Sequence, residues 1–386
     1  MIDMIELIAP CHFGLEAVLK KEVTDLGYEI TQVEDGRVTF RCPVAGVARA
    51  NIFLRTAERV LWKVGSFPAN SFDMLFECTK ALPWEDYIPA DGKFWVTKAS
   101  SVKSQLTATV TIQSVMKKAM VERLKEKLLV SELPETGAEY PVRVFLMKDI
   151  ATVALDTSGE PLHKRGYRQL TARAPISETL AAALLMLTPW TPGRVLMDPF
   201  CGSGTFLIEA AMMAADMAPG MNREFTAETW KNIVSRRVWY DAANEAADRV
   251  REDEQVGLLI GCDIDKEVLK LALGNARAAG VEKQIKLIRR DVADMKHPAS
   301  YGFVVTNPPY GVRLEEQAAL PALYKKFSDA FKTLDRWSAY VITPFDGVET
   351  AFGRPAAKKR KIYNGMLRTD FYSFPGPRPE FRKENA

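Results

Sequence analysis

The sequence has few of the residues that bind metals or form crosslinks. Its 386 residues include five cysteines and three histidines, and no two cysteines stand in a C-x-x-C pair. This composition predicts neither a zinc site nor a disulfide framework, and it fits a reducing cytoplasm. The longest apolar run, residues 180–187, is too short to span a bilayer, and the acidic N-terminus does not resemble a secretory signal. We therefore expect a cytoplasmic protein that binds no metal and no membrane.

An excess of one charge is also missing. Lys and Arg total 52 against 49 Asp and Glu, which gives a formal net charge of +3. Any surface for a polyanion must therefore come from local clusters of basic residues. One cluster lies on the polar side of residues 110–129, and a second interleaves basic groups with Tyr167; a solvated helix face and a charged linker are the respective alternatives. The candidate nucleic-acid ligands here are Lys98, Lys117, Lys118, His163, Lys164, Arg165 and Arg168.

The order of the predicted elements divides the first half of the chain into two domains. Residues 1–65 contain strand, helix, strand, helix and strand, an order that suits a ferredoxin-like domain. Residues 66–165 contain one strand, the long amphipathic helix and then a hairpin around Lys148-Asp149. We therefore expect two small α+β domains before residue 166.

Residues 166–386 alternate strands and helices. This alternation predicts an α/β domain with a mostly parallel, Rossmann-like sheet of seven strands. One helix is predicted over residues 320–334. The last two strands are expected to form an antiparallel hairpin, because Asn364-Gly365 is a strong hairpin signal.

A glycine-rich turn follows the first strand of this third domain. The strand ends at Asp198, and Gly202 and Gly204 precede a helix, an arrangement that lets a ligand approach the backbone. A dinucleotide fingerprint needs a third glycine or alanine where Leu207 stands, so a nicotinamide oxidoreductase is disfavoured. An acid before the turn would repel a pyrophosphate but suits a cationic, amino-acid-like ligand. S-adenosylmethionine has this character.

Two further acids stand at the ends of the next two strands. Asp263 can accept hydrogen bonds from ribose hydroxyls, and Asp291 can accept one from an adenine amino group, while Asp198 can bind an ammonium group. The carboxyl ends of parallel strands line one crevice, so we expect the three acids to share a cofactor site. The full predicted set is Asp198, Pro199, Phe200, Cys201, Gly202, Gly204, Thr205, Asp263, Ile264, Asp291, Val292 and Asn307.

The fourth strand ends in Asn307-Pro308-Pro309-Tyr310. Two prolines fix the backbone, so the Asn307 side chain and the Pro308 carbonyl can point at one spot as two acceptors. Two acceptors suit an exocyclic NH₂ group and leave its nitrogen lone pair free to attack. Tyr310 can stack on a base that has left its helix. We therefore predict that these four residues are catalytic.

These motifs resemble those of class I S-adenosylmethionine-dependent methyltransferases that modify nucleobase amino groups. The resemblance covers nearly the whole chain and includes residues 198–205, 307–311, 162–168 and 360–365. It implies a ferredoxin-like domain, an RNA-binding THUMP domain and a Rossmann-like methyltransferase domain. Val312 departs from the pattern, since this family often has glutamate there. Lys359 and Arg360, beside the last motif, join the predicted RNA ligands.

The branch that the sequence resembles contains the bacterial guanine-N2 methyltransferases of large-subunit ribosomal RNA, long labelled adenine-N6 DNA methylases. The resemblance therefore implies methyl transfer to guanine N2 of that RNA, with S-adenosylmethionine as cofactor. A homodimer is one assembly consistent with it. Two other functions stay open: an adenine-N6 methyltransferase of DNA or RNA, and a non-catalytic RNA-binding assembly factor.

Overall fold

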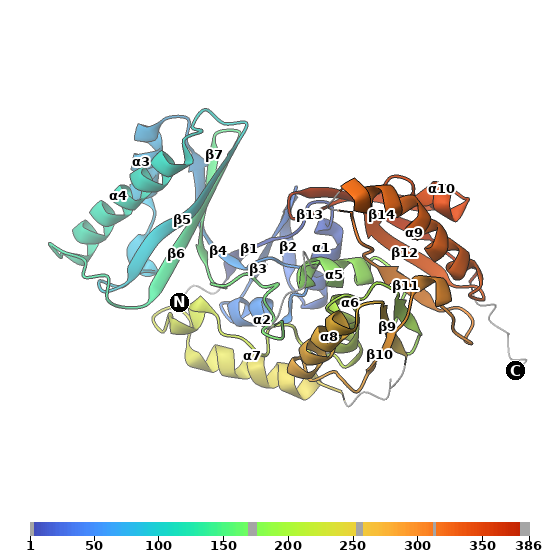
Figure 1. The fold of residues 1–386 in the computed structure, drawn as a ribbon. Helices are drawn as coiled ribbons and strands as arrows, with labels where there is room; N and C mark the ends of the chain where they lie inside the picture. The colour runs from blue at the N-terminus through green and yellow to red at the C-terminus, as the bar shows by residue number, and fades with distance from the viewer. Residues whose placement is uncertain (1–3, 169–175, 252–257, 312–313, 379–386) are drawn as a thin grey trace, which may run out of the picture. The chain divides into compact units, whose positions relative to one another are not determined.

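The computed structural model describes residues 4–168, 176–251, 258–311 and 314–378 (Figure 1). The chain folds into two compact units, each assembled from three segments of sequence. One unit contains residues 1–11, 19–162 and 223–246, and the other contains residues 12–18, 163–222 and 247–386. Among the described residues, no helix is both long enough and apolar enough to cross a membrane.

The strands of the first two predicted domains form one continuous sheet. Its order is β2-β3-β1-β4-β7-β6-β5, and β4 joins its two halves because it pairs with both β1 and β7. The strands are β1 (Ile5–Pro10), β2 (Glu29–Glu34), β3 (Arg37–Cys42), β4 (Leu61–Pro68), β5 (Lys93–Val102), β6 (Glu139–Met147) and β7 (Ile150–Asp156). Strands β6 and β7 form the hairpin expected around Lys148-Asp149.

The sequence analysis missed β2, so the expected strand-helix-strand-helix-strand order was wrong. The structure instead has β1-α1-β2-β3-α2-β4, with α1 at Glu16–Asp25 and α2 at Gly46–Phe53. Strand β2 lies at the edge of the sheet and leaves most of its side chains exposed. A strand with no buried face has no alternation of apolar and polar residues to reveal it.

Helices α3 and α4 cover one face of the β4–β7 half of this sheet (Figure 1). They span Phe72–Ala81 and Thr109–Leu128, and the short helix η1 (Trp84–Asp86) follows α3. The predicted long amphipathic helix is thus confirmed as α4, which buries Ile112, Met116 and Leu124.

A segment from late in the chain completes this unit. Residues 223–246 include η2 (Thr226–Thr229) and most of α7 (Arg236–Arg249). Trp230 is fully buried, stacks on Tyr140 at a centroid distance of 5.1 Å, and donates a hydrogen bond of 2.7 Å to the Glu139 carbonyl. Asn232 accepts a hydrogen bond of 2.8 Å from the Tyr140 hydroxyl. The segment therefore supplies part of the core of the unit.

The second unit contains the predicted Rossmann-like sheet. Its order is β10-β9-β8-β11-β12-β14-β13, parallel from β10 to β12, with β14 antiparallel to both β12 and β13. The strands are β8 (Leu196–Asp198), β9 (Leu259–Asp263), β10 (Ile285–Arg289), β11 (Phe303–Thr306), β12 (Ser338–Thr343), β13 (Lys358–Asn364) and β14 (Leu367–Phe374). The antiparallel C-terminal hairpin is confirmed.

Apolar cores lie on both faces of this sheet, as a parallel sheet requires. Helices α5, α6 and α8 cover one face, and α9 and α10 cover the other (Figure 1). Their bounds are α5 (Glu178–Met186), α6 (Thr205–Ala214), α8 (Lys266–Ala278), α9 (Leu314–Lys332) and α10 (Val348–Phe352). The short helix η3 (Val292–Asp294) follows β10.

Two local predictions in this unit need correction. Helix α9 begins at Leu314 and contains Pro321, so it starts a full turn and more before the predicted residue 320. The acidic residues Glu315 and Glu316 occupy its first turn, where their negative charges interact favourably with the positive end of the helix dipole. In the hairpin, Asn364 still pairs with Leu367, so the loop is Gly365 and the residue after it rather than Asn364-Gly365. Gly365 adopts φ +61°, which glycine reaches without strain.

Candidate active site

The strand order places the four predicted motifs side by side. Strands β10, β9, β8 and β11 are neighbours and run parallel, so their carboxyl ends meet at one edge of the sheet. Asp263 ends β9, Asp198 ends β8, Asn307 follows β11 directly, and Asp291 lies two residues after β10. The crevice expected from the sequence therefore has its parts adjacent in the second unit.

The glycine turn between β8 and α6 has the backbone that the sequence predicts. Gly202 and Gly204 have φ of +52° and +85°, and Gly204 is the N-cap of α6. A methyl group at Gly204 would lie 3.3 Å from Cβ of Ala272, whereas nothing among the described residues lies within 4 Å of one at Gly202. Asn275 steadies the turn by donating a hydrogen bond of 3.2 Å to the Ser203 carbonyl. The described residues therefore leave space for a ligand beside Gly202.

Asp198 is a buried carboxyl whose hydrogen-bond donors among the described residues are neutral. Only 2% of the residue is exposed, and Oδ1 accepts hydrogen bonds from the Thr306 hydroxyl (2.6 Å) and the Phe200 amide (3.1 Å). Burial raises the pKa of Asp198 to about 7, and the charge of Asp263 acts in the same direction. A bound cation would offset this cost of burial. Thr306, which fixes this carboxyl, was not among the predicted site residues.

The other two predicted acids differ in their surroundings. Asp263 accepts from the Gly202 amide at 3.1 Å and from the Asp265 amide at 3.0 Å, so it also braces the glycine turn. Asp291 is exposed and accepts from the Ala293 amide at 2.8 Å, which makes it the N-cap of η3. Both acids keep acceptor capacity for a ligand, since a carboxylate offers about four lone pairs.

Several residues of the predicted cofactor set lie on the buried side of the turn. Pro199, Cys201, Thr205 and Val292 are buried. Phe200 packs edge-on against Phe327 at a centroid distance of 5.6 Å. Ile264 is the exception, because 63% of it is exposed directly after Asp263. An exposed apolar side chain at that position offers a flat contact for an adenine ring.

The Asn307-Pro308-Pro309-Tyr310 segment makes its own hydrogen bond. The Tyr310 hydroxyl donates to Asn307 Oδ1 at 2.5 Å, so the asparagine oxygen is accessible to a donor on that side. Burial raises the pKa of Tyr310 to about 12, which keeps the hydroxyl protonated. Asn364, at the end of β13, donates to the same hydroxyl at 3.3 Å and was not predicted. Val312, the residue that departs from the family pattern, lies outside the described residues.

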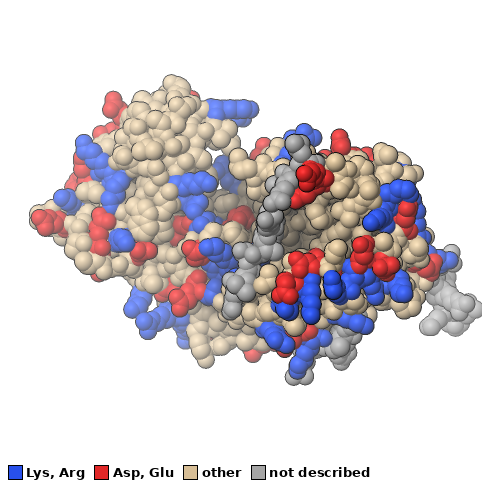
Figure 2. Space-filling model, in the orientation of Figure 1, with Lys and Arg blue, Asp and Glu red and all other residues tan. Residues whose placement is uncertain are grey.

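The lysines predicted to bind RNA in the first unit are not equally available. Lys98 and Lys118 are exposed, and Lys118 lies 5.6 Å from the ring centre of Phe76. Lys117 instead forms an ion pair of 2.6 Å with Glu135. Figure 2 shows acidic side chains interspersed with basic ones over this region, rather than an uninterrupted basic face. RNA binding by these lysines stays a prediction.

The structure corrects part of the prediction that the second basic cluster, residues 163–168, binds nucleic acid. Arg165 is only 3% exposed and lies 3.6 Å from Glu209, which also accepts from the Tyr167 hydroxyl at 3.1 Å. Arg168 pairs with Glu178 at 3.2 Å and donates to Thr205 at 2.7 Å. Arg165 and Tyr167 therefore belong to a buried polar network, not to a surface for phosphates and bases. A sequence does not show which acids will meet its arginines in the interior.

The remaining members of that set are more exposed. Lys164 is exposed and His163 is half-buried. Lys359 lies 3.5 Å from Asp370 and 4.8 Å from the ring centre of Tyr372, while Arg360 donates to the Gly14 carbonyl at 2.9 Å. RNA binding by these residues also stays a prediction.

The described residues fit S-adenosylmethionine and offer no metal site. Asp198 is a buried acid with only neutral donors, and the space at Gly202 is open, as a cationic ligand above the turn would need. Within the described ranges, no group of three or more His, Cys, Asp or Glu side chains could hold a metal ion.

The fold and the site together define a class I methyltransferase, the class whose methyl donor is S-adenosylmethionine. Family models match three parts of the chain: an RlmL ferredoxin-like domain at residues 6–61, a THUMP domain at 69–156, and an RMKL-like methyltransferase domain at 165–372. The chain therefore belongs to the RMKL-like methyltransferase family.

Known relatives match almost the full length. The chain is 45% identical over 384 residues, 98% of it and 99% of the relative, to "Putative RNA methyltransferase YpsC" of Bacillus subtilis. The crystal structure of "a possible methylase" from Clostridium difficile is 47% identical with a TM-score of 0.95, covering 98% of this chain and 100% of that one. The crystal structure of "SMU.472, a putative methyltransferase complexed with SAH" is 41% identical with a TM-score of 0.92, covering 98% of this chain and 100% of that one.

Proposed function

We propose that this protein transfers a methyl group from S-adenosylmethionine to an exocyclic amino group of a nucleobase in RNA, namely guanine N2 of large-subunit ribosomal RNA. The observation that supports it best is the donor at Asn307 Oδ1: the Tyr310 hydroxyl lies 2.5 Å from it, where an N–H of a substrate amine would donate. The match to a THUMP domain and the name of the Bacillus relative support RNA as the substrate.

The residues of the chain would act by positioning. Asn307 Oδ1 and the Pro308 carbonyl accept hydrogen bonds from the two N–H groups of the amine. These bonds favour a tetrahedral nitrogen, whose lone pair is no longer delocalised into the ring of the base. The Tyr310 hydroxyl must leave Asn307 when the base enters, and its ring is then free to stack on that base. The cofactor would supply an electrophilic methyl group: as the N–C bond forms, the C–S bond breaks, its electron pair stays on sulfur in S-adenosylhomocysteine, and the amine loses one proton to solvent. Correct placement of the two reactants supplies much of the rate enhancement, because it replaces a bimolecular encounter by an oriented contact.

Asp198, Asp263 and Asp291 would hold the cofactor. Asp198 faces the turn as a buried acid and suits the ammonium group, and Asp263 braces the turn while accepting from ribose hydroxyls. Asp291 and the exposed Ile264 would take the adenine ring and its amino group. Pro199, Phe200, Cys201, Thr205 and Val292 keep these groups in place from the buried side.

The decisive experiment compares the ribosomal RNA of wild-type and deletion cells by mass spectrometry of nucleoside digests. The proposal predicts that one N2-methylguanosine disappears in the deletion strain and returns with the wild-type gene but not with Asn307→Ala. Unchanged N2-methylguanosine together with a loss of N6-methyladenosine in RNA or DNA would favour the adenine-N6 alternative.

The non-catalytic alternative makes a different prediction. An assembly factor that only retains the fold need not bind the cofactor, so calorimetry with S-adenosylhomocysteine would show no heat of binding. Binding at micromolar ligand together with methyl transfer to isolated RNA would rule that alternative out.

A further inference from the structure

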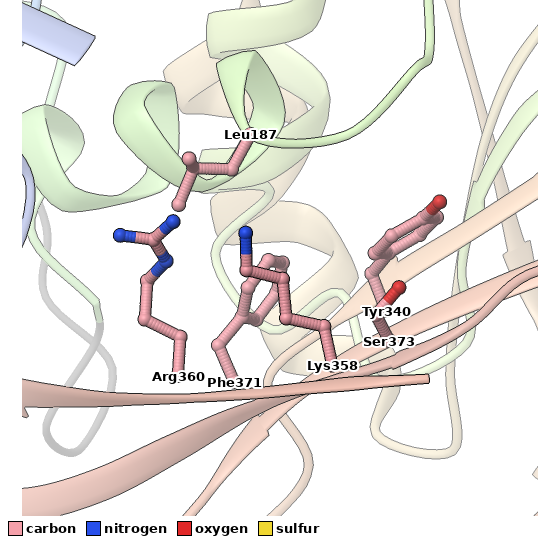
Figure 3. Close-up of a pocket in the computed structure, with 6 residues that line it drawn as sticks. All are labelled: Leu187, Tyr340, Lys358, Arg360, Phe371 and Ser373. Carbon is pink, nitrogen blue, oxygen red and sulfur yellow. The ribbon is translucent and has the colours of Figure 1, made fainter. Parts of the chain in front are cut away.

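A small basic pocket lies on the face of the second unit's sheet that α5 covers. Its lining residues come from the end of α5 and from three neighbouring strands: Leu187, Tyr340, Lys358, Arg360, Phe371 and Ser373. Figure 3 shows the Lys358 amino group and the Arg360 guanidinium rising together from β13 toward Leu187, with the Tyr340 and Ser373 hydroxyls at the other end. The part of this lining that the structure describes contains two cations and two hydroxyls and no carboxylate.

Strand geometry explains why only two of the four consecutive basic residues of β13 reach this pocket. Successive side chains of a strand point to opposite faces, so Lys358 and Arg360 share the face of the buried Ile362. Lys359 and Lys361 take the other face, where Lys359 lies by Asp370 and Tyr372. Lys359, which the sequence analysis selected, is therefore not in the pocket, and Lys358, which it did not select, is.

The side chain of Arg360 is held in place in this pocket by a hydrogen bond. Its Nη1 donates to the Gly14 carbonyl at 2.9 Å, so one edge of the guanidinium is fixed while the group keeps its full positive charge. Arginine offers five N–H donors in a planar fork, which suits the oxygens of a phosphate. Lys358 adds a compact charge two residues away on the same face.

The pocket is connected to the candidate active site by β13 itself. Asn364, at the carboxyl end of this strand, contacts the Tyr310 hydroxyl at 3.3 Å. At a rise of about 3.3 Å per residue, Arg360 lies roughly 13 Å and Lys358 roughly 20 Å along the strand from Asn364. A nucleotide chain leaving the target base along this edge strand would pass both cations.

We propose that this pocket binds a backbone phosphate of the RNA substrate close to the target nucleotide, with Lys358 and Arg360 as its two ionic ligands. The proposal rests on the proposed function for the class of substrate. The site reads no base, so it would fix the register of the RNA on the enzyme rather than its sequence.

The test compares Lys358 with Lys361, which has the same charge on the same strand but faces away from the pocket. Binding of in vitro transcribed large-subunit ribosomal RNA is measured by fluorescence anisotropy over a range of salt. We expect Lys358→Ala to weaken binding several-fold and Lys358→Glu to weaken it further. The slope of log affinity against log salt should fall by about 0.7 to 0.9 for one lost phosphate contact. Lys361→Ala and Lys361→Glu should bind RNA about as tightly as the wild type. The affinity of Arg360→Lys should lie between those of the wild type and Lys358→Ala.

Two outcomes would overturn the proposal. If the Lys358 and Lys361 variants lose equal affinity, the effect is general charge rather than a pocket. If the Lys358 variants bind RNA as the wild type does, the pocket holds no RNA phosphate. That second result overturns the proposal even if inorganic phosphate binds the wild-type protein there, since it would assign the site to free phosphate. Calorimetry with S-adenosylhomocysteine checks that each variant is folded.

Nucleoside analysis of the same RNA separates this proposal from the proposed function. If the wild-type protein binds RNA through Lys358 but produces no N2-methylguanosine, the proposed function fails and the pocket stands. If it produces the methylated base while Lys358 proves irrelevant, the pocket fails and the proposed function stands.

Discussion

Asp198 is the residue at which cofactor affinity should depend on pH near neutrality. Burial raises the pKa of Asp198 to about 7, whereas a bound ammonium group favours the ionised carboxylate. Below this pKa the carboxyl must first lose a proton before it can hold a cation. We expect the affinity for S-adenosylhomocysteine to fall by up to about tenfold for each pH unit below 7 and to level off above it. Calorimetry across this range measures the slope.

Asp198→Asn provides the control for this prediction. The amide has nearly the same shape but does not titrate, so its affinity should be weaker and independent of pH across the same window. A wild-type profile as flat as that of the variant would show that Asp198 does not bind the cation.

Tyr310 should act through its ring more than through its hydroxyl. Tyr310→Phe removes the hydrogen bond to Asn307 but keeps the stacking surface, so we expect kcat/KM to stay within a few-fold of wild type. Tyr310→Ala removes the stacking, which contributes about 1–3 kcal/mol per base, or roughly 5- to 150-fold in kcat/KM. Steady-state methylation of RNA measures both variants. A larger loss for Phe than for Ala would contradict this role.

At the residue scale, the sequence predicts best those side chains that sit at strand ends. Asp198 and Asn307 could be found because a buried strand, a turn and a polar residue follow one another along the chain. Thr306 and Asn364 could not, because their partners are fixed only by the sheet order. Arg165 was misjudged for the same reason, since Glu209 is 44 residues away and meets it only in the folded core.

Among the elements, the β8–α6 turn has two glycines whose replacement should have different effects, one mainly on stability and the other mainly on ligand binding. An alanine at either glycine must adopt positive φ, which costs about 1–2 kcal/mol. Gly204→Ala also brings a methyl group to 3.3 Å from Cβ of Ala272, whereas Gly202→Ala points into open space. We therefore expect Gly204→Ala to lower the melting temperature more.

The second measurement in this pair is cofactor affinity. The methyl group of Gly202→Ala occupies the open side of the turn, so that variant should lose more affinity for S-adenosylhomocysteine relative to its small loss of stability. If both variants lose stability and affinity in the same proportion, the space at Gly202 is not used by the ligand.

Element prediction was incomplete even where burial imposes a period, because α3 and α7 bury residues at helical spacing and were not predicted. Helix α4 and the β6–β7 hairpin bury one face and were found. Strand β2 is a polar edge strand with no such period. Helix α9 was predicted to begin at Leu320, six residues too late, although it runs from Leu314 through Pro321.

For the whole molecule, the continuous sheet of the first unit bears on the predicted boundary at residue 65. Strand β4 spans Leu61–Pro68 and pairs with β7 along its length, so a cut at residue 65 divides it. We expect a fragment of residues 1–65 to show no cooperative thermal unfolding by circular dichroism, because it leaves an exposed sheet edge and a broken strand. A sharp transition and a dispersed NMR spectrum would show that the first predicted domain folds alone.

The interleaving of the two units also has a consequence for the protein during its synthesis. Tyr140 leaves the ribosome long before Trp230, the ring that stacks on it, and residues 163–222 of the other unit are made in between. The apolar surface that Trp230 covers therefore stays exposed to solvent until Trp230 has been synthesised. The nascent chain is thus most open to chaperones, or to premature association with its neighbours on a polysome, while that intervening stretch is being translated.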